Sequence, residues 1–274
     1  MKRVGILYHP KIDRAKAFCR ELEQFLSARD ISSWLCSAWE EEEAKPQVAA
    51  SDLLLSIGGD GTILRTARAA IPHPVPVVGI NLGNLGFMTE IKASEAFEKL
   101  PLLLDGKGWI EERAMLEAEP MCQSKGLHAL NDVVVGRGSS ARLVQVETII
   151  DDEFLTTYRA DAVIVATATG STGYSLAAGG PILYPRAKEI LLKPVCSHLA
   201  MDKAMVLPSE SVVQLKVNTS HYAMLSVDGQ VELQLSSGDE VRIKLSPYST
   251  RFLRLQPESY FYGSLGLKFK GKLL

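Results

Sequence analysis

The stretch LLLSIGGDGTIL, residues 53–64, decides how the N-terminal part of the chain folds. Its apolar run LLLSI predicts a buried strand, and the helical pattern TILRTARAA begins directly after the glycines. A glycine-rich turn between a strand and a helix normally closes its backbone amides on phosphate oxygens. Asp60 stands inside this turn, where its carboxylate would repel phosphate. The presence of an acidic residue at this position therefore has to be explained.

The sequence on both sides of this turn alternates between short apolar runs and helical patterns. VGILY at 4–8 and VPVVGI at 75–80 are typical of buried strands, and ASEAFEKLPLLL at 93–104 is helical. We expect Asp13 to cap a further helix. The apolar face of that helix consists of Ala15, Phe18, Leu22 and Phe25. Such alternation predicts an α/β domain over residues 1–105 with an open, mostly parallel sheet and ligands beyond the carboxyl ends of its strands.

After about Trp109 the hydrophobic period changes to two, which indicates β-structure. The alternating segments are VQVETIIDDEFLTTY at 144–158, VVQLKV at 212–217, MLSVDGQVELQL at 224–235 and EVRIKL at 240–245. We therefore predict a second, mainly β, sandwich-like domain over 106–254, with Asp228 and Gly229 forming a hairpin turn. The tail 255–274 loses the alternation and is expected to complete the first domain.

The composition of the chain argues against some classes of partner and indicates a cellular compartment. The 274 residues include 30 Lys and Arg against 32 Asp and Glu, a net charge of -2, which argues against nucleic acid or a membrane as partner. The four cysteines never form a CxxC pair, so we expect buried free thiols, a reducing compartment and a cytoplasmic protein. The histidines show no metal-ligand spacing. The run EEEE at 40–43 is interpreted as a solvated loop.

Two common nucleotide motifs are excluded. The pattern GxxxxGK[ST] is absent, which removes the main support for Walker-type hydrolysis. GRGSSA at 136–141 fits the GxGxxA form of a dinucleotide fingerprint, but the following RLVQVETII at 142–150 alternates like a strand. We therefore reject this segment as a Rossmann loop.

GGDGT supports two interpretations. In the first it is a tight turn in which Asp60 caps the helix, with Thr62 helping to satisfy the free amides. In the second, Asp60 holds a substrate hydroxyl in line with a phosphorus atom, and a metal ion and backbone dipoles offset the repulsion from the donor phosphates. A carboxylate is a weak base, but positioning matters more than proton removal in a loose phosphoryl-transfer transition state.

The segment DAVIVATATGSTGYSLAAGGP at 161–181 joins a buried strand to small and hydroxyl residues and then to Tyr174 at the head of a short helix. Small residues let a flat ring approach the backbone, hydroxyls and amides bind a base edge, and a tyrosine stacks. A capped strand-to-helix turn would look the same, so both interpretations stay open.

Asn131 and Asp132 stand side by side ahead of a strand in ALNDVVVGRG at 129–138. An amide next to a carboxylate suits a sugar diol, although Asn-Asp is also common turn chemistry. Arg142 and Arg159 are local positive charges that can face phosphates, with an ordinary surface position as the alternative for each.

Taken in order, GGDGTIL, GINLGNLGF, ALNDVVVGRG, YRADAVIVATATGSTGYSLAAGGPI, the short SHL element at 197–199 and SVDGQ resemble the NAD kinase family across most of the chain. GGDGT alone is shared with the diacylglycerol and sphingosine lipid kinases. The Thr- and Ser-rich loop with its tyrosine separates this chain from them.

The resemblance implies phosphorylation of the adenosine 2′-hydroxyl of NAD to give NADP, with ATP or polyphosphate as donor, a divalent metal ion such as magnesium, and a homodimer or homotetramer. Asp60 matches the catalytic aspartate of the family. The positions that match substrate-binding residues are Gly61, Phe87, Asn131, Asp132, Arg142, Arg159, Asp161, Thr169, Thr172, Gly173, Tyr174, Ser175, Leu176, Ala177 and Gln230.

The sequence departs from the family pattern at four positions. Ala168 replaces a proline, Gly173 an alanine and Ala177 a serine, and Ser197 stands where a proline often precedes the histidine. Loss of the proline and the added glycine loosen the loop, and loss of the serine removes a hydrogen-bonding group. We expect a shift in affinity or dinucleotide preference and no change in the reaction class.

Two alternatives remain at this point. A lipid kinase of the same superfamily would need an apolar pocket for acyl chains in the β domain, and the tyrosine loop argues against it. A non-catalytic dinucleotide sensor would keep the pocket without the chemistry, but a pure binder gains nothing from a carboxylate beside phosphate.

Overall fold

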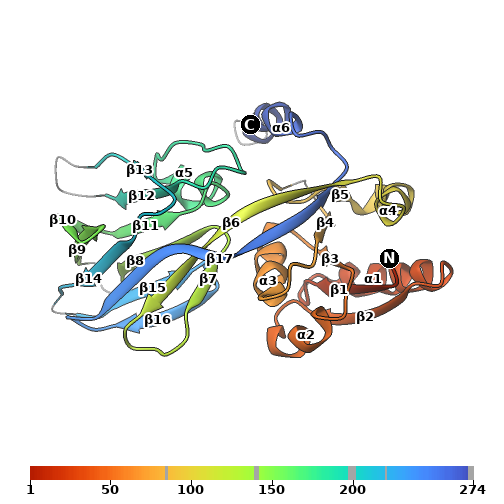
Figure 1. The fold of residues 1–274 in the computed structure, drawn as a ribbon, viewed down its shortest axis with the longest axis horizontal. Coiled ribbons are helices and arrows are strands. Elements are labelled where there is room, and N and C mark those ends of the chain that lie inside the picture. Colours follow the sequence, from red (N-terminus) through yellow and green to blue (C-terminus); the bar gives the residue numbers. More distant parts are fainter. Residues whose placement is uncertain (84–85, 139–141, 197–201, 220, 271–274) are drawn as a thin grey trace. The chain divides into compact units, whose positions relative to one another are not determined.

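The computed structural model describes residues 1–83, 86–138, 142–196, 202–219 and 221–270. The chain divides into two compact units, Met1–Glu112 with Thr250–Leu274, and Arg113–Ser249. Both boundaries fall inside long strands, β6 (Trp109–Pro120) and β17 (Glu240–Arg254), which pair with each other (Figure 1). Each of these strands therefore contributes residues to both units.

The first unit is built on a parallel sheet with the strand order β2–β1–β3–β4. Its strands are β1 (Arg3–Tyr8), β2 (Ser32–Ser37), β3 (Leu53–Ile57) and β4 (Val77–Asn81). The short β5 (Ile91–Lys92) and the end of β17 at Phe252 also pair with β4 in parallel. The predicted α/β class and the strands predicted at VGILY, LLLSI and VPVVGI are confirmed.

Helices cover both faces of this sheet. They are α1 (Asp13–Ser27), α2 (Glu41–Val48), α3 (Asp60–Ala70), η1 (Ala93–Glu95) and α4 (Ala96–Leu104). A further helix, α6 (Tyr260–Lys270), follows β17 in the chain. α1 and α4 share one core with alternate strand residues such as Ile6, Leu55 and Val78. α3 packs on the opposite face, where Ile63 occupies the space above Gly79, a position with no room for a side chain. This packing leaves the GGDG turn at the carboxyl end of β3.

Three local predictions for the first unit and the cysteines are wrong. Asp13 is the first helical residue of α1, after Ile12, and makes no side-chain cap. The acidic run is not a loop, because α2 begins at Glu41 and buries Ala44 and Val48. Cys19 is a buried free thiol as expected. The other free cysteines are partly or fully exposed: Cys36, Cys122 and Cys196.

The second unit consists of two antiparallel sheets packed over one apolar core. The first sheet has the order β13–β12–β11–β8–β15–β16. Its strands are β8 (Asp132–Arg137), β11 (Ala162–Ala166), β12 (Ile190–Val195), β13 (Met205–Leu207), β15 (Ala223–Val227) and β16 (Val231–Leu235). The second contains β7 (Leu127–Ala129), β9 (Val144–Ile150), β10 (Glu153–Ala160) and β14 (Val213–Val217), together with parts of β6 and β17.

The predicted sandwich-like β-structure is therefore confirmed. The strand predicted after GRGSSA is also confirmed as β9, which supports rejecting that segment as a Rossmann loop. Alternate residues of each strand face opposite sides. Val133 and Val135 of β8 enter the core, whereas Val134 lies on the outer face of the six-stranded sheet. Two short helices, η2 (Gly170–Thr172) and α5 (Tyr174–Ala177), follow β11.

The helices of the described ranges are short or polar compared with a membrane span. None of them combines the length and the apolar character that a crossing would require.

Candidate active site

The carboxylate of Asp60 is held by the backbone of a distant segment. α3 begins at Asp60 with Gly59 in the N-cap position and no side-chain cap, so the interpretation of Asp60 as a cap is wrong. Its two oxygens instead accept hydrogen bonds from the N–H groups of Phe87 (2.7 Å) and Met88 (3.1 Å). Each oxygen of a carboxylate has two acceptor positions. Asp60 therefore retains capacity to accept a bond from a substrate hydroxyl.

The segment around Phe87 is shaped to receive this carboxylate. A side chain at Gly86 would overlap the carboxyl group of Asp60, and the Gly86 N–H donates to Thr89 Oγ1 at 2.8 Å. The structure thus brings together two predicted site residues, Asp60 and Phe87, through the main chain of the latter. Gly61 is exposed in the first turn of α3. Asn84 and Leu85 of the same motif lie outside the described residues.

The side chain of Thr62 does not satisfy the amides of α3, contrary to the sequence prediction. Thr62 is 1% exposed, and its Oγ1 has no hydrogen-bond partner in the described part of the chain. A side chain at Gly58 would collide with this hydroxyl. Gly58 is therefore required by the close approach of Thr62.

The second unit carries a groove on the outer face of its six-stranded sheet. Two cavities of about 390 and 410 Å³ share Val134, Tyr174 and Ser226 as lining residues. We call them together the Tyr174 groove. Asn131, Asp132 and Asp228 line the first cavity, and Arg137 and Asp161 line the second.

Tyr174 stands between the two parts of the groove with 45% of its surface exposed. It is the first residue of α5, as predicted for the aromatic residue of this segment. Burial and the nearby charge of Asp161 raise the pKa of its phenol, which therefore stays protonated. Asp161 forms an ion pair with Arg137 (2.8 Å between Oδ1 and Nε). The groove thus offers an aromatic face beside a paired charge.

Asp228 organises the other end of the groove. The chain turns between β15 and β16 with positive φ at Asp228 (54°) and Gly229 (63°), which confirms the predicted hairpin turn. The Asp228 carboxylate accepts backbone N–H groups from three consecutive residues. They are Leu130 (3.0 Å), Asn131 (2.7 Å) and Asp132 (3.2 Å). The sequence predicts the turn but not this clamp, whose only signal is an acidic residue at the turn.

The clamp places two carboxyl groups near each other. Asp132 is 6% exposed, and burial together with the negative charge of Asp228 raises the pKa of Asp132 to about 7. At neutral pH this carboxyl therefore exchanges a proton easily, and it can either donate a hydrogen bond or accept one.

The loop after β11 fixes the Asn131–Asp132 pair from the other side. The Thr167 hydroxyl donates to the Leu130 carbonyl (2.6 Å), and the Thr167 N–H donates to the Asn131 carbonyl (2.9 Å). A side chain at Gly170 would collide with the same Asn131 carbonyl. A methyl group at Gly173 would lie 3.3 Å from the Gly170 carbonyl oxygen, so the alanine typical of the family would require a small shift of this loop.

Two buried hydroxyls of this loop are left without partners. Thr169 Oγ1 and Ser175 Oγ have no hydrogen-bond partner among the described residues, and both residues are at most 4% exposed. Buried polar atoms are normally bonded, so such atoms call for an explanation, which a ligand would supply. By contrast, the Thr172 hydroxyl donates to the Thr169 carbonyl (3.0 Å). Leu176 is half-buried and Ala177 exposed on α5.

Of the predicted contact residues in the second unit, Asn131, Asp132, Asp161 and Tyr174 line the groove, whereas Arg142, Arg159 and Gln230 are among those that do not. Arg142 is exposed and has its guanidinium 3.0 Å from Nε2 of His221. Arg159 is exposed on β10 in the other sheet. Gln230 follows the hairpin turn, where its N–H donates to the Val227 carbonyl. The SHL element, residues 197–199, lies outside the described residues.

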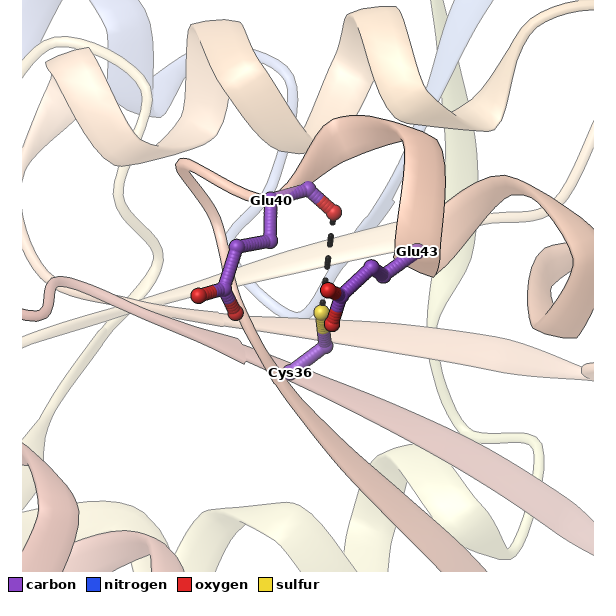
Figure 2. Close-up of side chains that lie close together, drawn as sticks. All are labelled: Cys36, Glu40 and Glu43. Atoms are coloured by element: carbon purple, nitrogen blue, oxygen red, sulfur yellow. Dashed lines mark hydrogen bonds between the residues drawn. The ribbon is translucent and has the colours of Figure 1, made fainter.

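A separate group of possible metal ligands occurs in the first unit. Figure 2 shows Cys36 beside Glu40 and Glu43, with ligand atoms within 4.8 Å of one another and the thiol donating to the Glu40 carbonyl. Burial and the two negative charges raise the pKa of the Cys36 thiol. Because the thiolate is the form that binds metals, this shift opposes metal binding. We assign no ion to this group.

These features define a class of protein: a phosphotransferase with a glycine-rich strand-to-helix turn in an α/β unit and a polar, aromatic groove in a β unit. Family models for the ATP-NAD kinase N-terminal and C-terminal domains match residues 28–108 and 130–255. The chain belongs to the NAD kinase family.

Individual relatives agree with this assignment. An NAD kinase of Dehalococcoides mccartyi is 46% identical over 98% of this chain and 96% of its own length, and one of Chloroflexus aggregans is 43% identical over 97% of each. Yeast NADH kinase in complex with NADH has a TM-score of 0.81 at 28% identity, covering 94% of this chain and 84% of its own. An Archaeoglobus fulgidus NAD kinase with ATP also scores 0.81, at 25% identity over 96% and 97%. The relatives favour NAD kinase over the lipid kinase and the sensor.

Proposed function

We propose that this protein is an NAD kinase, which transfers a phosphoryl group to the adenosine 2′-hydroxyl of NAD and forms NADP. The observation that carries the proposal is the Asp60 carboxylate, fixed at the start of α3 by the amides of Phe87 and Met88. Membership of the NAD kinase family supports it.

We assign to Asp60 the alignment of the attacking hydroxyl. The 2′-oxygen forms a bond to the transferred phosphorus, the bond from phosphorus to the leaving oxygen breaks, and the hydroxyl proton passes to Asp60. Phosphoryl transfer depends mainly on positioning and on charge stabilisation. A carboxylate already held by two backbone donors supplies the positioning. The helix N-terminus beside it favours the donor phosphates.

We assign the dinucleotide to the second unit, in the Tyr174 groove. Tyr174 offers a face for ring stacking, and Asn131 with Asp132 suits a ribose diol. The unpartnered hydroxyls of Thr169 and Ser175 support a polar ligand at this loop. Substrate binding in general, at the groove or elsewhere, is also proposed for the remaining family-matched positions: Gly61, Phe87, Arg142, Arg159, Asp161, Thr172, Gly173, Leu176, Ala177 and Gln230.

Magnesium is the expected metal ion. In kinases this ion is typically held largely by the donor phosphates and water, so Asp60 would remain available to the substrate hydroxyl. When bound, it would neutralise charge on those phosphates. We further propose ATP or polyphosphate as donor, a homodimer or homotetramer, and a cytoplasmic location.

The test is NADP formation by the purified protein from NAD and magnesium with ATP, another nucleoside triphosphate or polyphosphate. Asp60→Asn removes the proton acceptor but keeps the size of the side chain. We expect its kcat to fall about 100-fold or more, since general-base contributions are of that size, with the Kd for NAD little changed.

The matched control is Asp105→Asn, which removes an exposed carboxylate from the same unit and should leave kcat unchanged. Turnover of Asp60→Asn at the wild-type rate would show that the Asp60 carboxylate is not needed for phosphoryl transfer. Tight NAD binding by the wild-type protein without product from any donor would instead favour a sensor.

A further inference from the structure

A buried arginine lies directly behind the segment that holds Asp60. Arg254, the last residue of β17, donates from Nη1 to the Met88 carbonyl at 2.7 Å. The N–H of the same Met88 donates to Asp60 Oδ1 at 3.1 Å. The main chain of Met88 therefore connects Asp60, which accepts its N–H, with Arg254, which donates to its carbonyl.

Two glutamates fix the guanidinium in turn. Nε of Arg254 bonds Glu111 Oε2 at 2.8 Å, and Nη1 lies 3.2 Å from Glu90 Oε2. All three residues are at most 8% exposed. The planar guanidinium stands over the ring of the buried Phe252, 4.5 Å from its centroid. The arginine therefore has little freedom to move.

Glu90 also ties down the chain beyond β17. Its Oε1 accepts the N–H groups of Leu255 (2.8 Å) and Gln256 (2.9 Å), while its own N–H donates to the Gly79 carbonyl of β4. The segment 86–90 is thus anchored to the sheet and to the end of β17. All of these contacts lie within the first unit.

We propose that Arg254 is a positioning residue, which holds the Met88 peptide group so that its N–H fixes the Asp60 carboxylate in the orientation needed for phosphoryl transfer. This inference rests on the proposed role of Asp60. Buried ion pairs contribute little net stability compared with apolar replacements, and they are strongly destabilising only when one partner is lost. A role in stability alone would not require the bond to the Met88 carbonyl.

The positioning role of Arg254 predicts that its loss lowers kcat and leaves KM unchanged. Misplacing a reacting group by about 1 Å can lower the rate about 100-fold without weakening substrate binding. Arg254→Lys keeps a positive charge between the glutamates but lacks the rigid fork of the guanidinium. We expect kcat for NADP formation to fall about 10-fold or more, with the KM for NAD within about twofold of the wild-type value.

A triple variant separates positioning from stability. Glu90→Gln, Arg254→Met and Glu111→Gln together remove all three buried charges, and the amide oxygen introduced by Glu90→Gln can still accept the two backbone N–H groups. This variant should recover a melting temperature close to that of the wild type, because no buried charge is left unpaired. Its kcat should stay at least about 10-fold low, because the arginine that donates to the Met88 carbonyl is gone.

Arg251→Met is the matched control. Arg251 also lies on β17 and donates to a backbone carbonyl, that of Pro74. It should leave kcat unchanged. Wild-type kcat in either Arg254→Lys or the triple variant would overturn the positioning role. An increase in KM with unchanged kcat would do the same. The proposed function would survive these results if Asp60→Asn were still inactive.

Discussion

Asp132 is the buried carboxyl whose protonation the structure alters most clearly. Its pKa of about 7 lies above the ordinary value of 3.8, because the group is buried and faces the charge of Asp228. A raised pKa means that the folded state binds the proton more tightly than the unfolded state. The stabilisation contributed by this proton is therefore complete only below the ordinary pKa of 3.8, and it is lost as the pH rises through about 7.

The direction of this pH dependence predicts how the stability of Asp132→Asn differs from that of the wild type. The variant carries no charge at any pH, so its stability relative to the wild type should increase between pH 4 and pH 7 and then stay constant. The gain is at most about 4 kcal/mol, the free energy that corresponds to the whole shift. Urea denaturation at pH 4, 6 and 8 measures it. The same substitution at the exposed Asp105 controls for the loss of one carboxyl group.

An equal difference between variant and wild type at pH 4 and pH 8 would contradict the assignment. NAD binding gives a second readout, since the proposed contact of Asp132 with the ribose predicts that Asp132→Asn raises the Kd for NAD.

The sequence draws attention to some of these residues and gives no sign of others. Asp60, Asn131, Asp132 and Tyr174 stand in short motifs whose residue types already indicate their chemistry. The partners that fix them are separated by long stretches of chain: the Phe87 and Met88 amides for Asp60, and Asp228 for the 130–132 backbone. A backbone amide has no sequence signature, so only the folded structure reveals these contacts.

Two turn glycines with positive φ allow the effect of backbone strain to be compared at and away from the Tyr174 groove. Gly229 in the β15–β16 turn and Gly238 in the β16–β17 turn have φ of 63° and 94°, and at neither does any atom lie within 4 Å of the place that a methyl group would occupy. Substitution by alanine therefore strains the backbone at both sites without a collision. Each change should destabilise the protein by about 1 kcal/mol.

Only one of these glycines, Gly229, lines the Tyr174 groove. We expect Gly229→Ala to raise the KM for NAD several-fold, because a strained turn shifts the Asp228 clamp, and Gly238→Ala to leave KM unchanged. Denaturation midpoints and steady-state kinetics of the two variants test this. Equal effects on KM would mean that the β15–β16 turn has no special connection with the groove.

At the scale of elements, strong periodicity was a reliable guide and polar sequence was not. The buried strands β1, β3 and β4 follow directly from their apolar runs. The helix α2 was missed because EEEEAKPQV lacks a clear apolar face and contains a proline. It is stabilised by burial of Ala44 and Val48 and by the Glu41–Arg68 ion pair (2.7 Å), which joins it to α3. That contact is tertiary, and local propensity does not include it.

For the molecule as a whole, ligand binding should appear as added stability. A ligand that binds only the folded state stabilises it by about 2.7 kcal/mol at 100 times its Kd. NAD at that concentration should raise the melting temperature by several degrees. Tyr174→Phe keeps the ring and should preserve the shift, whereas Tyr174→Ala should reduce it by lowering affinity.

Differential scanning fluorimetry over a series of NAD concentrations measures these shifts. Phe154→Ala is the control, because this aromatic residue of the same unit is 62% exposed and does not line the groove. A full NAD shift in Tyr174→Ala would argue against stacking on the tyrosine.

The division of the chain also sets an order of events during synthesis. Residues 113–249 leave the ribosome before Thr250, so the second unit can fold while the first still lacks its final strand segment. Until Arg254 emerges, Glu90 and Glu111 lack the cation with which they form ion pairs in the folded protein. Unpaired carboxylates favour water, so we expect this corner of the first unit to close only once the end of β17 has emerged and paired with β4.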